Sequence, residues 1–253
     1  MADNRSFFAV GCSGFKYLTW RGAFYPVTAD ASGMLEYYCG QFSTVELNTS
    51  YYGFLRPETL SLWAAQVPPG FIFSLKVPRS LACLPPGPEM KAQWEQLMFM
   101  IDPLNQGQAL GALLFQVPAG RERDIESLEA LASLARDRGI DTAFEFRHPS
   151  WHTPEVRKLL EGFHHDVAAV SLPEQEPFLD VISSFKYFRL SGRRREGNHD
   201  YTFRELLAWK EQILAAQEKA ARIYVYFNNH AKGCAPLNAR NLFRRVLHYS
   251  PDP

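Results

Sequence analysis

The stretch FEFRHPSW, residues 144–151, decides the fold. Phe144 and Phe146 are aromatic residues of the kind that strands favour, and Pro149 ends regular strand pairing. A helix is predicted directly afterwards, because residues 153–155 supply a threonine N-cap, a proline for the first turn and a glutamate close behind it. The stretch therefore predicts one strand–helix unit of an α/β protein.

Four side chains that can bind a ligand or carry chemistry lie where this strand ends, namely Glu145, Arg147, His148 and Trp151. A strand that is apolar until its last residues and polar just before a helix is typical of α/β enzymes, which build their sites at the carboxyl ends of strands. The stretch is therefore also the first candidate for a functional site.

The rest of the chain repeats this layout. Strands are predicted at residues 7–10, 44–48, 71–77, 110–117, 143–146, 167–171, 187–190 and 222–227, mostly with helices between them. Alternating strands and helices imply parallel pairing with right-handed crossovers. The 253 residues therefore predict an α/β fold of the (β/α)8 TIM-like barrel type, a single domain over residues 1–253.

One feature of the sequence leaves an alternative fold open. The sixth unit is weak, because prolines interrupt residues 173–183 and leave room for little helix. An open doubly wound sheet is the alternative, but such sheets usually have fewer strands and begin with a G-x-G-x-x-G turn, which GCSG at residues 11–14 does not match.

Composition narrows the class of protein. The chain is 46% hydrophobic with a formal net charge of +0, which supports a large core and excludes a uniformly basic surface for nucleic acid. The 4 cysteines show no metal-ligand spacing, no signal peptide is recognisable, and no segment reaches the ~20 apolar residues of a membrane helix. We expect a cytoplasmic protein without membrane contact, and the sequence leaves its oligomeric state open.

Polar and charged residues gather at the predicted strand ends. In a closed barrel they approach one mouth: Ser13, Glu46, Asn48, Lys76, Gln116, Glu145, Arg147, Arg189, Asn228 and Asn229. Unpaired buried charges cost several kcal/mol, so one interpretation is that these carboxylates and cations simply neutralise one another. The other is a functional site, which a ring of charges at this end of the fold favours.

The residue types fit acid–base chemistry on an anion. Two carboxylates, Glu46 and Glu145, can serve as general acid and base. Cations that suit a phosphate are Lys76, Arg79, Arg147 and Arg189, while Asn48, Gln116 and Asn228 can orient a ligand. Trp20, Tyr51 and Trp151 are candidates for stacking on a base or sugar, although the aromatic loop around Trp20 can equally be a lid packed on the barrel. No metal and no cofactor are expected, because few histidines lie at strand ends.

Seven of these segments together resemble one family, the domain of unknown function DUF72, also called YecE-like. They are GxSG at 11–14, WRGxFYP at 20–26, VExN at 45–48, KVPR at 76–79, LFQVP at 114–118, EFRHPSW at 145–151 and YFNN at 226–229. The resemblance covers nearly the whole chain. It implies a TIM-like barrel and no established activity.

The chain departs from this family's pattern at several places. Phe15 stands where the family usually has Trp, and residues 80–83 lack the His that commonly follows KVPR. Ser191 stands where His is usual before Gly, and His230 replaces an Asp. The resemblance therefore carries over no mechanism that needs those groups.

Three hypotheses for function follow. The first is an enzyme of the hydrolase or isomerase kind, in which Glu46 and Glu145 perform acid–base chemistry on a phosphate-bearing small molecule or nucleic-acid fragment. The second is a non-catalytic protein that binds an anionic ligand through the same ring. The third is a glycosidase-like enzyme on a neutral sugar, which requires the two carboxyl groups to flank one bond.

Overall fold

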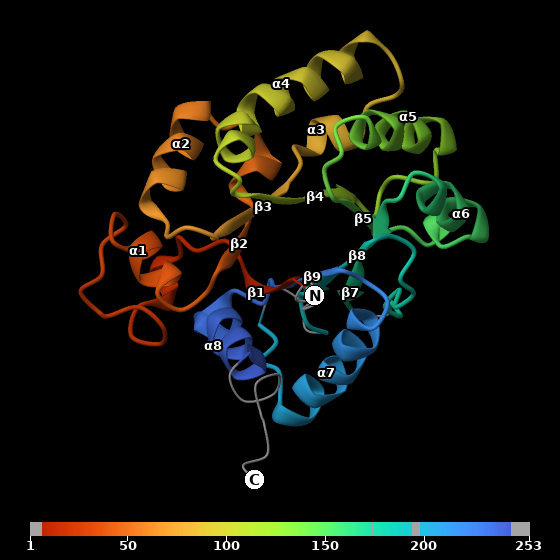
Figure 1. Ribbon diagram of the computed structural model, residues 1–253. Coiled ribbons are helices and arrows are strands. Elements are labelled where there is room, and N and C mark those ends of the chain that lie inside the picture. Colours follow the sequence, from red (N-terminus) through yellow and green to blue (C-terminus); the bar gives the residue numbers. More distant parts are fainter. Residues whose placement is uncertain (1–6, 174, 194–197, 244–253) are drawn as a thin grey trace, which may run out of the picture.

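The structure is a computed structural model that describes residues 7–173, 175–193 and 198–243. Its strands form one parallel sheet that curls into a barrel, with the helices around the outside (Figure 1). The strands are β1 (Phe7–Ser13), β2 (Thr44–Leu47), β3 (Ile72–Lys76), β4 (Leu110–Val117), β5 (Thr142–Phe146), β6 (Asp166–Val167), β7 (Ala169–Ser171), β8 (Phe185–Leu190) and β9 (Arg222–Phe227). Neighbours pair in the order β6-β5-β4-β3-β2-β1-β9-β8-β7, which confirms the predicted barrel.

The predicted strand at residues 167–171 is in fact two short strands. β6 pairs with β5, whereas β7 pairs with β8. Between them Ala168 donates its backbone N–H to the Phe144 carbonyl oxygen, 2.9 Å away. The chain therefore changes partner at Ala168, and the two ends of the sheet are one residue apart in sequence, as a nearly closed barrel requires and an open doubly wound sheet does not.

The helices follow the strands along the chain. They are α1 (Met34–Cys39), α2 (Pro57–Gln66), α3 (Arg79–Ala82), α4 (Pro88–Gln106), α5 (Ile125–Arg136), α6 (Pro154–Gly162), α7 (Phe203–Gln217) and α8 (Cys234–Asn241). α6 begins as predicted, with the Thr153 side chain accepting the Val156 N–H at 3.4 Å and Pro154 in the first turn. The described residues between β7 and β8 contain no helix, which fits the prolines of that unit.

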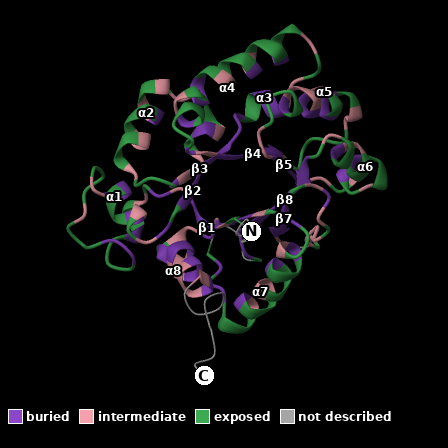
Figure 2. Cartoon of the chain, in the orientation of Figure 1, coloured by how far each residue is buried: buried purple, intermediate pink, exposed green. Residues whose placement is uncertain are grey.

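Two apolar layers hold the barrel together. One lies between the strands and the helices, and the other fills the barrel interior with Ala112, Leu114, Val170, Tyr187 and Tyr226 among others. Buried residues accordingly lie on the strands and the inner faces of the helices, and exposed residues lie on the outer faces (Figure 2). The interior becomes polar only towards the carboxyl ends of the strands.

Candidate functional site

Five polar side chains form the last layer of the barrel interior. Because alternate residues of a strand face the same side, the alternation places Glu46 of β2, Lys76 of β3, Gln116 of β4, Glu145 of β5 and Arg189 of β8 inside. All five residues are at most 7% exposed. Burial of this many polar groups requires that they satisfy one another's hydrogen bonds.

Arg189 is the central group of this layer. Its Nε lies 3.0 and 3.1 Å from the two carboxylate oxygens of Glu46, and its Nη1 lies 3.2 Å from Oε2 of Glu145. Its Nη2 donates to Ser13 Oγ at 3.2 Å and to Asn48 Oδ1 at 3.4 Å, while Ser13 Oγ itself donates to Glu46. One guanidinium therefore joins side chains from β1, β2 and β5.

Each carboxylate has further donors. The Tyr187 hydroxyl donates to Oε2 of Glu46 at 2.6 Å. Oε1 of Glu145 accepts from Gln116 Nε2 at 2.5 Å and from Arg147 Nε at 2.6 Å. Both glutamates thus accept three or more hydrogen bonds, and both are completely buried.

The electrostatics of Glu145 disfavour proton exchange near neutral pH. Burial alone would raise the pKa of its carboxyl, but Arg189, Arg147 and Lys76 outweigh burial and lower it to about 2. A carboxylate with this pKa stays ionised and is a weak base at pH 7. The arrangement therefore favours a positioning part for Glu145, which holds Arg189, over the acid–base part expected from the sequence.

Lys76 is the exception in the layer. No hydrogen bond or ion pair joins its amine to any residue that the structure describes, and its Nζ lies 3.4 Å from the centroid of the Tyr51 ring. Burial, reinforced by Arg189, lowers the pKa of Lys76 to about 7 against the opposing effect of Glu145 and Glu46. The Lys76 amine therefore gives up its proton more readily than an ordinary lysine does.

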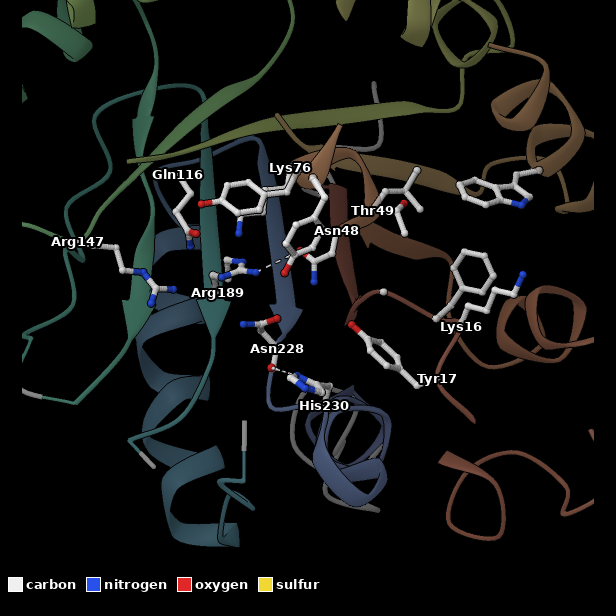
Figure 3. Close-up of a pocket in the computed structure, with 16 residues that line it drawn as sticks. Lys16, Tyr17, Asn48, Thr49, Lys76, Gln116, Arg147, Arg189, Asn228 and His230 are labelled. Atoms are coloured by element: carbon white, nitrogen blue, oxygen red, sulfur yellow. Dashed lines mark hydrogen bonds between the residues drawn. The ribbon is translucent and has the colours of Figure 1, made fainter. Parts of the chain in front are cut away.

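A cavity of about 460 Å³ opens above this layer (Figure 3). Its lining residues are Gly14, Phe15, Lys16, Tyr17, Leu47, Asn48, Thr49, Tyr51, Tyr52, Trp63, Lys76, Gln116, Arg147, Arg189, Asn228 and His230. Its size is that of a small-molecule site. Its wall carries cations, amides and aromatic rings.

The structure brings most of the predicted site residues together. Those that line the cavity are Asn48, Tyr51, Lys76, Gln116, Arg147, Arg189 and Asn228. Glu46, Glu145 and Ser13 are bonded to Arg189 and lie outside the cavity lining. The strand-end pattern therefore located the site, whereas the depth of each side chain was not readable from the pattern.

The two tryptophans predicted to stack on a ligand are core residues instead. Trp20 is 0% exposed, and its indole donates to the His230 carbonyl oxygen at 2.7 Å. Trp151 is 4% exposed, stacks on Phe146 with 4.7 Å between ring centroids, and donates to the Arg121 carbonyl oxygen at 2.8 Å. Neither lines the cavity, so the lid interpretation of the aromatic loop fits Trp20 better.

Two further predicted ligand residues also lie outside the cavity. Asn229 is completely buried and donates to the His199 carbonyl oxygen and to Asn238 Oδ1, both at 2.7 Å, so it fastens the loop after β8 to α8. Arg79 is exposed at the first residue of α3.

Five rings of the cavity wall, among them Tyr17 and His230, were not among the predicted site residues. Tyr17 and His230 stack with their centroids 5.4 Å apart and their planes within 16°. His230 directly follows the YFNN motif and Tyr17 lies three residues after GxSG, and these positions were the available signal. Phe15 and His230, two of the departures from the family's pattern, both line the cavity.

No group of three or more His, Cys, Asp and Glu side chains that could hold a metal ion occurs among the described residues. Within the same part of the chain, no helix is long and apolar enough to cross a membrane.

The fold and the site define a class: TIM-like barrels with a closed charged layer beneath an open cavity at the carboxyl ends of the strands. The family described as protein of unknown function DUF72 matches residues 9–251, and the chain belongs to this family.

Solved and curated relatives agree with this assignment. A DUF72 family protein from Thermotoga maritima MSB8 superposes with a TM-score of 0.85 at 28% identity, covering 96% of this chain and 100% of that one. The UPF0759 protein YunF of Bacillus subtilis (strain 168) is 24% identical over 260 residues, 89% of this chain and 91% of its own. D-Psicose 3-epimerase from Clostridium cellulolyticum H10 has a TM-score of 0.59 at 11% identity, covering 95% and 98% of the two chains, and shows the shared barrel fold alone.

Proposed function

We propose that the cavity binds a small molecule with an anionic group, most simply a phosphate, and that Lys76 is its reactive group. The observation that carries the proposal is the convergence of Lys76, Arg147 and Arg189 on one cavity (Figure 3). Cations are costly to gather in a buried place unless something neutralises them. Such a gathering in a cleft is therefore a candidate anion site.

Within the layer, Lys76 is the cation that no carboxylate balances. The guanidinium groups of Arg147 and Arg189 balance the carboxylates of Glu46 and Glu145 through the bonds described above. When Lys76 is protonated, its charge is the excess one, and the lowered pKa reflects that excess. An anion in the cavity would balance it, so anion binding favours the protonated form of Lys76.

Of Lys76, Arg147 and Arg189, Arg147 has the most accessible donors. Its Nε is bonded to Glu145, and no described residue accepts a hydrogen bond from its two terminal nitrogens. Its side chain is 30% exposed. A guanidinium in this state can donate two parallel hydrogen bonds to phosphate oxygens. Asn48 and Asn228, which also line the cavity, supply amide groups to orient the rest of the ligand.

The aromatic rings of the cavity support a ligand that carries a flat or ring-shaped group besides its phosphate. Tyr17, Tyr51 and His230 present rings that can stack on a sugar or a base. A phosphorylated small molecule or a nucleic-acid fragment would match both the cations and the aromatic rings of the cavity. The reaction class then belongs with the hydrolases or isomerases, with Lys76 in place of the two glutamates as the group that exchanges protons.

The other two hypotheses have less support. A glycosidase needs two carboxyl groups on either side of one glycosidic bond, and both Glu46 and Glu145 are buried against protein donors. A non-catalytic binding protein would use the same anion site, but it gives no reason for an amine whose pKa is lowered to about 7 in the cavity.

We also propose a cytoplasmic location. The support is that all of the cysteines, Cys12, Cys39, Cys83 and Cys234, are free thiols.

Isothermal titration with glycerol 3-phosphate, and with glycerol as the uncharged control, tests the proposal. We expect saturable binding of the phosphate ester alone, weakened about 10- to 100-fold by Arg147→Gln because a charged hydrogen bond is lost. Arg138→Gln is the matched control, because Arg138 pairs with Glu95 on the exposed surface. Equal binding of glycerol 3-phosphate and glycerol, or an affinity of the Arg147→Gln variant equal to that of the wild type, would contradict the proposal.

A further inference from the structure

We propose that Lys76 forms an imine with the carbonyl carbon of an aldehyde or ketone that also carries a phosphate. This inference rests on the proposed anion site and deepens it, because it names the substrate class. It assigns the phosphate to Arg147 and the carbonyl group to Lys76, two side chains that line the same cavity.

The Lys76 amine is placed where it can meet a substrate in the cavity. Lys76 is the last residue of β3, a rigid element, and it is 7% exposed with that exposure directed into the cavity. A nucleophile must meet its substrate without first leaving a strong partner. Among the described residues no acceptor binds the Lys76 amine, and its one described contact is the face of the Tyr51 ring.

The carboxylates near Lys76 are already paired with arginines. Glu46 and Glu145 would normally hold a lysine in its charged form. Here Arg189 binds both of them, and Arg147 binds Glu145 as well. Desolvation next to other cations is a recognised way to make a lysine nucleophilic.

Four charged groups have the largest effect, after burial, on the pKa of Lys76. Arg189 of β8 and Arg147 after β5 disfavour the ammonium form, whereas Glu145 and Glu46 favour it. Because its pKa is lowered to about 7, Lys76 loses its proton near neutral pH, whereas an ordinary lysine, with a pKa of about 10.4, stays almost wholly protonated. Before an anion binds, the supply of free amine at Lys76 is therefore much larger than at an ordinary lysine.

The chemical step balances without an oxidant or reductant. The Lys76 nitrogen lone pair attacks the carbonyl carbon and forms a C–N bond, and the carbonyl oxygen takes up the proton that the nitrogen releases. A second proton, from water that enters the open cavity and leaves as a hydroxide ion for the buffer to neutralise, converts that hydroxyl group into water, which departs as the C=N bond forms. The product iminium carries one positive charge, as the protonated amine does, so it suits the same bound phosphate.

The geometry also explains why an imine would be limited to certain ligands. A carbonyl compound without an anionic group has no partner for Arg147, and a phosphate without a carbonyl group binds but forms no covalent bond. Glycolaldehyde phosphate combines both groups in a molecule small enough for a 460 Å³ cavity. Glycolaldehyde and inorganic phosphate are its two matched controls.

The test is reductive trapping. The protein is incubated with glycolaldehyde phosphate and cyanoborohydride at pH 7.5, and peptide mapping by mass spectrometry locates the reduced adduct. We expect one adduct at Lys76, formed at least 10-fold faster than with glycolaldehyde and suppressed by inorganic phosphate. Lys76→Arg should abolish it, and Lys91→Arg, on the exposed face of α4, should leave it unchanged.

The outcomes separate this inference from the proposed function. Binding of glycerol 3-phosphate without any adduct at Lys76 would overturn the imine and leave the anion site standing. Labelling spread evenly over the exposed lysines, insensitive to phosphate, would overturn it too. If glycerol 3-phosphate does not bind either, both proposals fail together.

Discussion

Replacing Arg189 with methionine tests the charged layer most severely. Methionine keeps much of the side-chain volume and removes the guanidinium that binds Glu46 at 3.0 Å and Glu145 at 3.2 Å. Breaking a buried ion pair by removing one partner costs about 3–5 kcal/mol, because the remaining charge is left buried. Tyr187 and Arg147 still donate to the two carboxylates, so we expect about 4 kcal/mol rather than the sum of two such losses.

Urea unfolding at pH 7, followed by circular dichroism, measures this loss. With a slope of about 2–3 kcal/mol per molar urea, the midpoint should fall by about 1.5–2 M. The loss should shrink as the pH is lowered towards 4, because the stranded carboxylates of the variant have raised pKa values and become neutral in the folded protein.

Arg138→Met is the control for this experiment. Arg138 contacts both oxygens of Glu95 at 3.0 and 3.1 Å, but both side chains are about half exposed or more, so the pair should contribute at most about 1 kcal/mol. A loss below about 1 kcal/mol for Arg189→Met, or equal losses in the two variants, would refute the claim that the buried ion pairs of Arg189 with Glu46 and Glu145 stabilise the barrel.

Three further predictions concern stability. Lys186→Met should cost about 3–5 kcal/mol at pH 8, since it strands the wholly buried Asp166, and Asp166→Asn in the same chain should recover most of the loss in urea unfolding. Gly11→Ala should cost about 1–3 kcal/mol because its Cβ would lie 2.2 Å from a backbone oxygen of β2, while Gly53→Ala, whose Cβ meets nothing within 4 Å, should stay within about 0.5 kcal/mol. The folded pKa of Glu145 is lowered from 4.5 to about 2, so its ionisation contributes about 3 kcal/mol to the free energy of unfolding above pH 4.5, and this contribution is lost as the pH falls towards 2. Glu145→Gln should remove this acid dependence of stability. An unchanged profile of stability against pH in the variant would contradict the prediction.

The barrel was predictable because its signals are local. Each strand is a short apolar run, each helix start carries a cap such as Thr153, and the order of the two along the chain admits few topologies. The break at Ala168 was not predictable. Residues on either side of it are equally apolar, and the change of partner from β5 to β8 is a property of barrel closure.

The site was predictable in position and less so in detail. Polar residues at strand ends identify the mouth, because parallel strands end on the same side. Which of them pair depends on distances across the barrel: Arg189 and Glu46 are 143 residues apart in sequence. Trp20 shows a second limit, since a tryptophan is equally suited to a core and to a ligand wall.

The most direct test of the central claim is the titration of the Lys76 amine itself. NMR of protein carrying ¹⁵N-labelled lysine, assigned with Lys76→Arg, follows the Nζ signal with pH in the absence and presence of inorganic phosphate. The account predicts a pKa of about 7 that phosphate raises, because a bound anion favours the ammonium form. A pKa near the ordinary value of about 10.4, unmoved by phosphate, would contradict it.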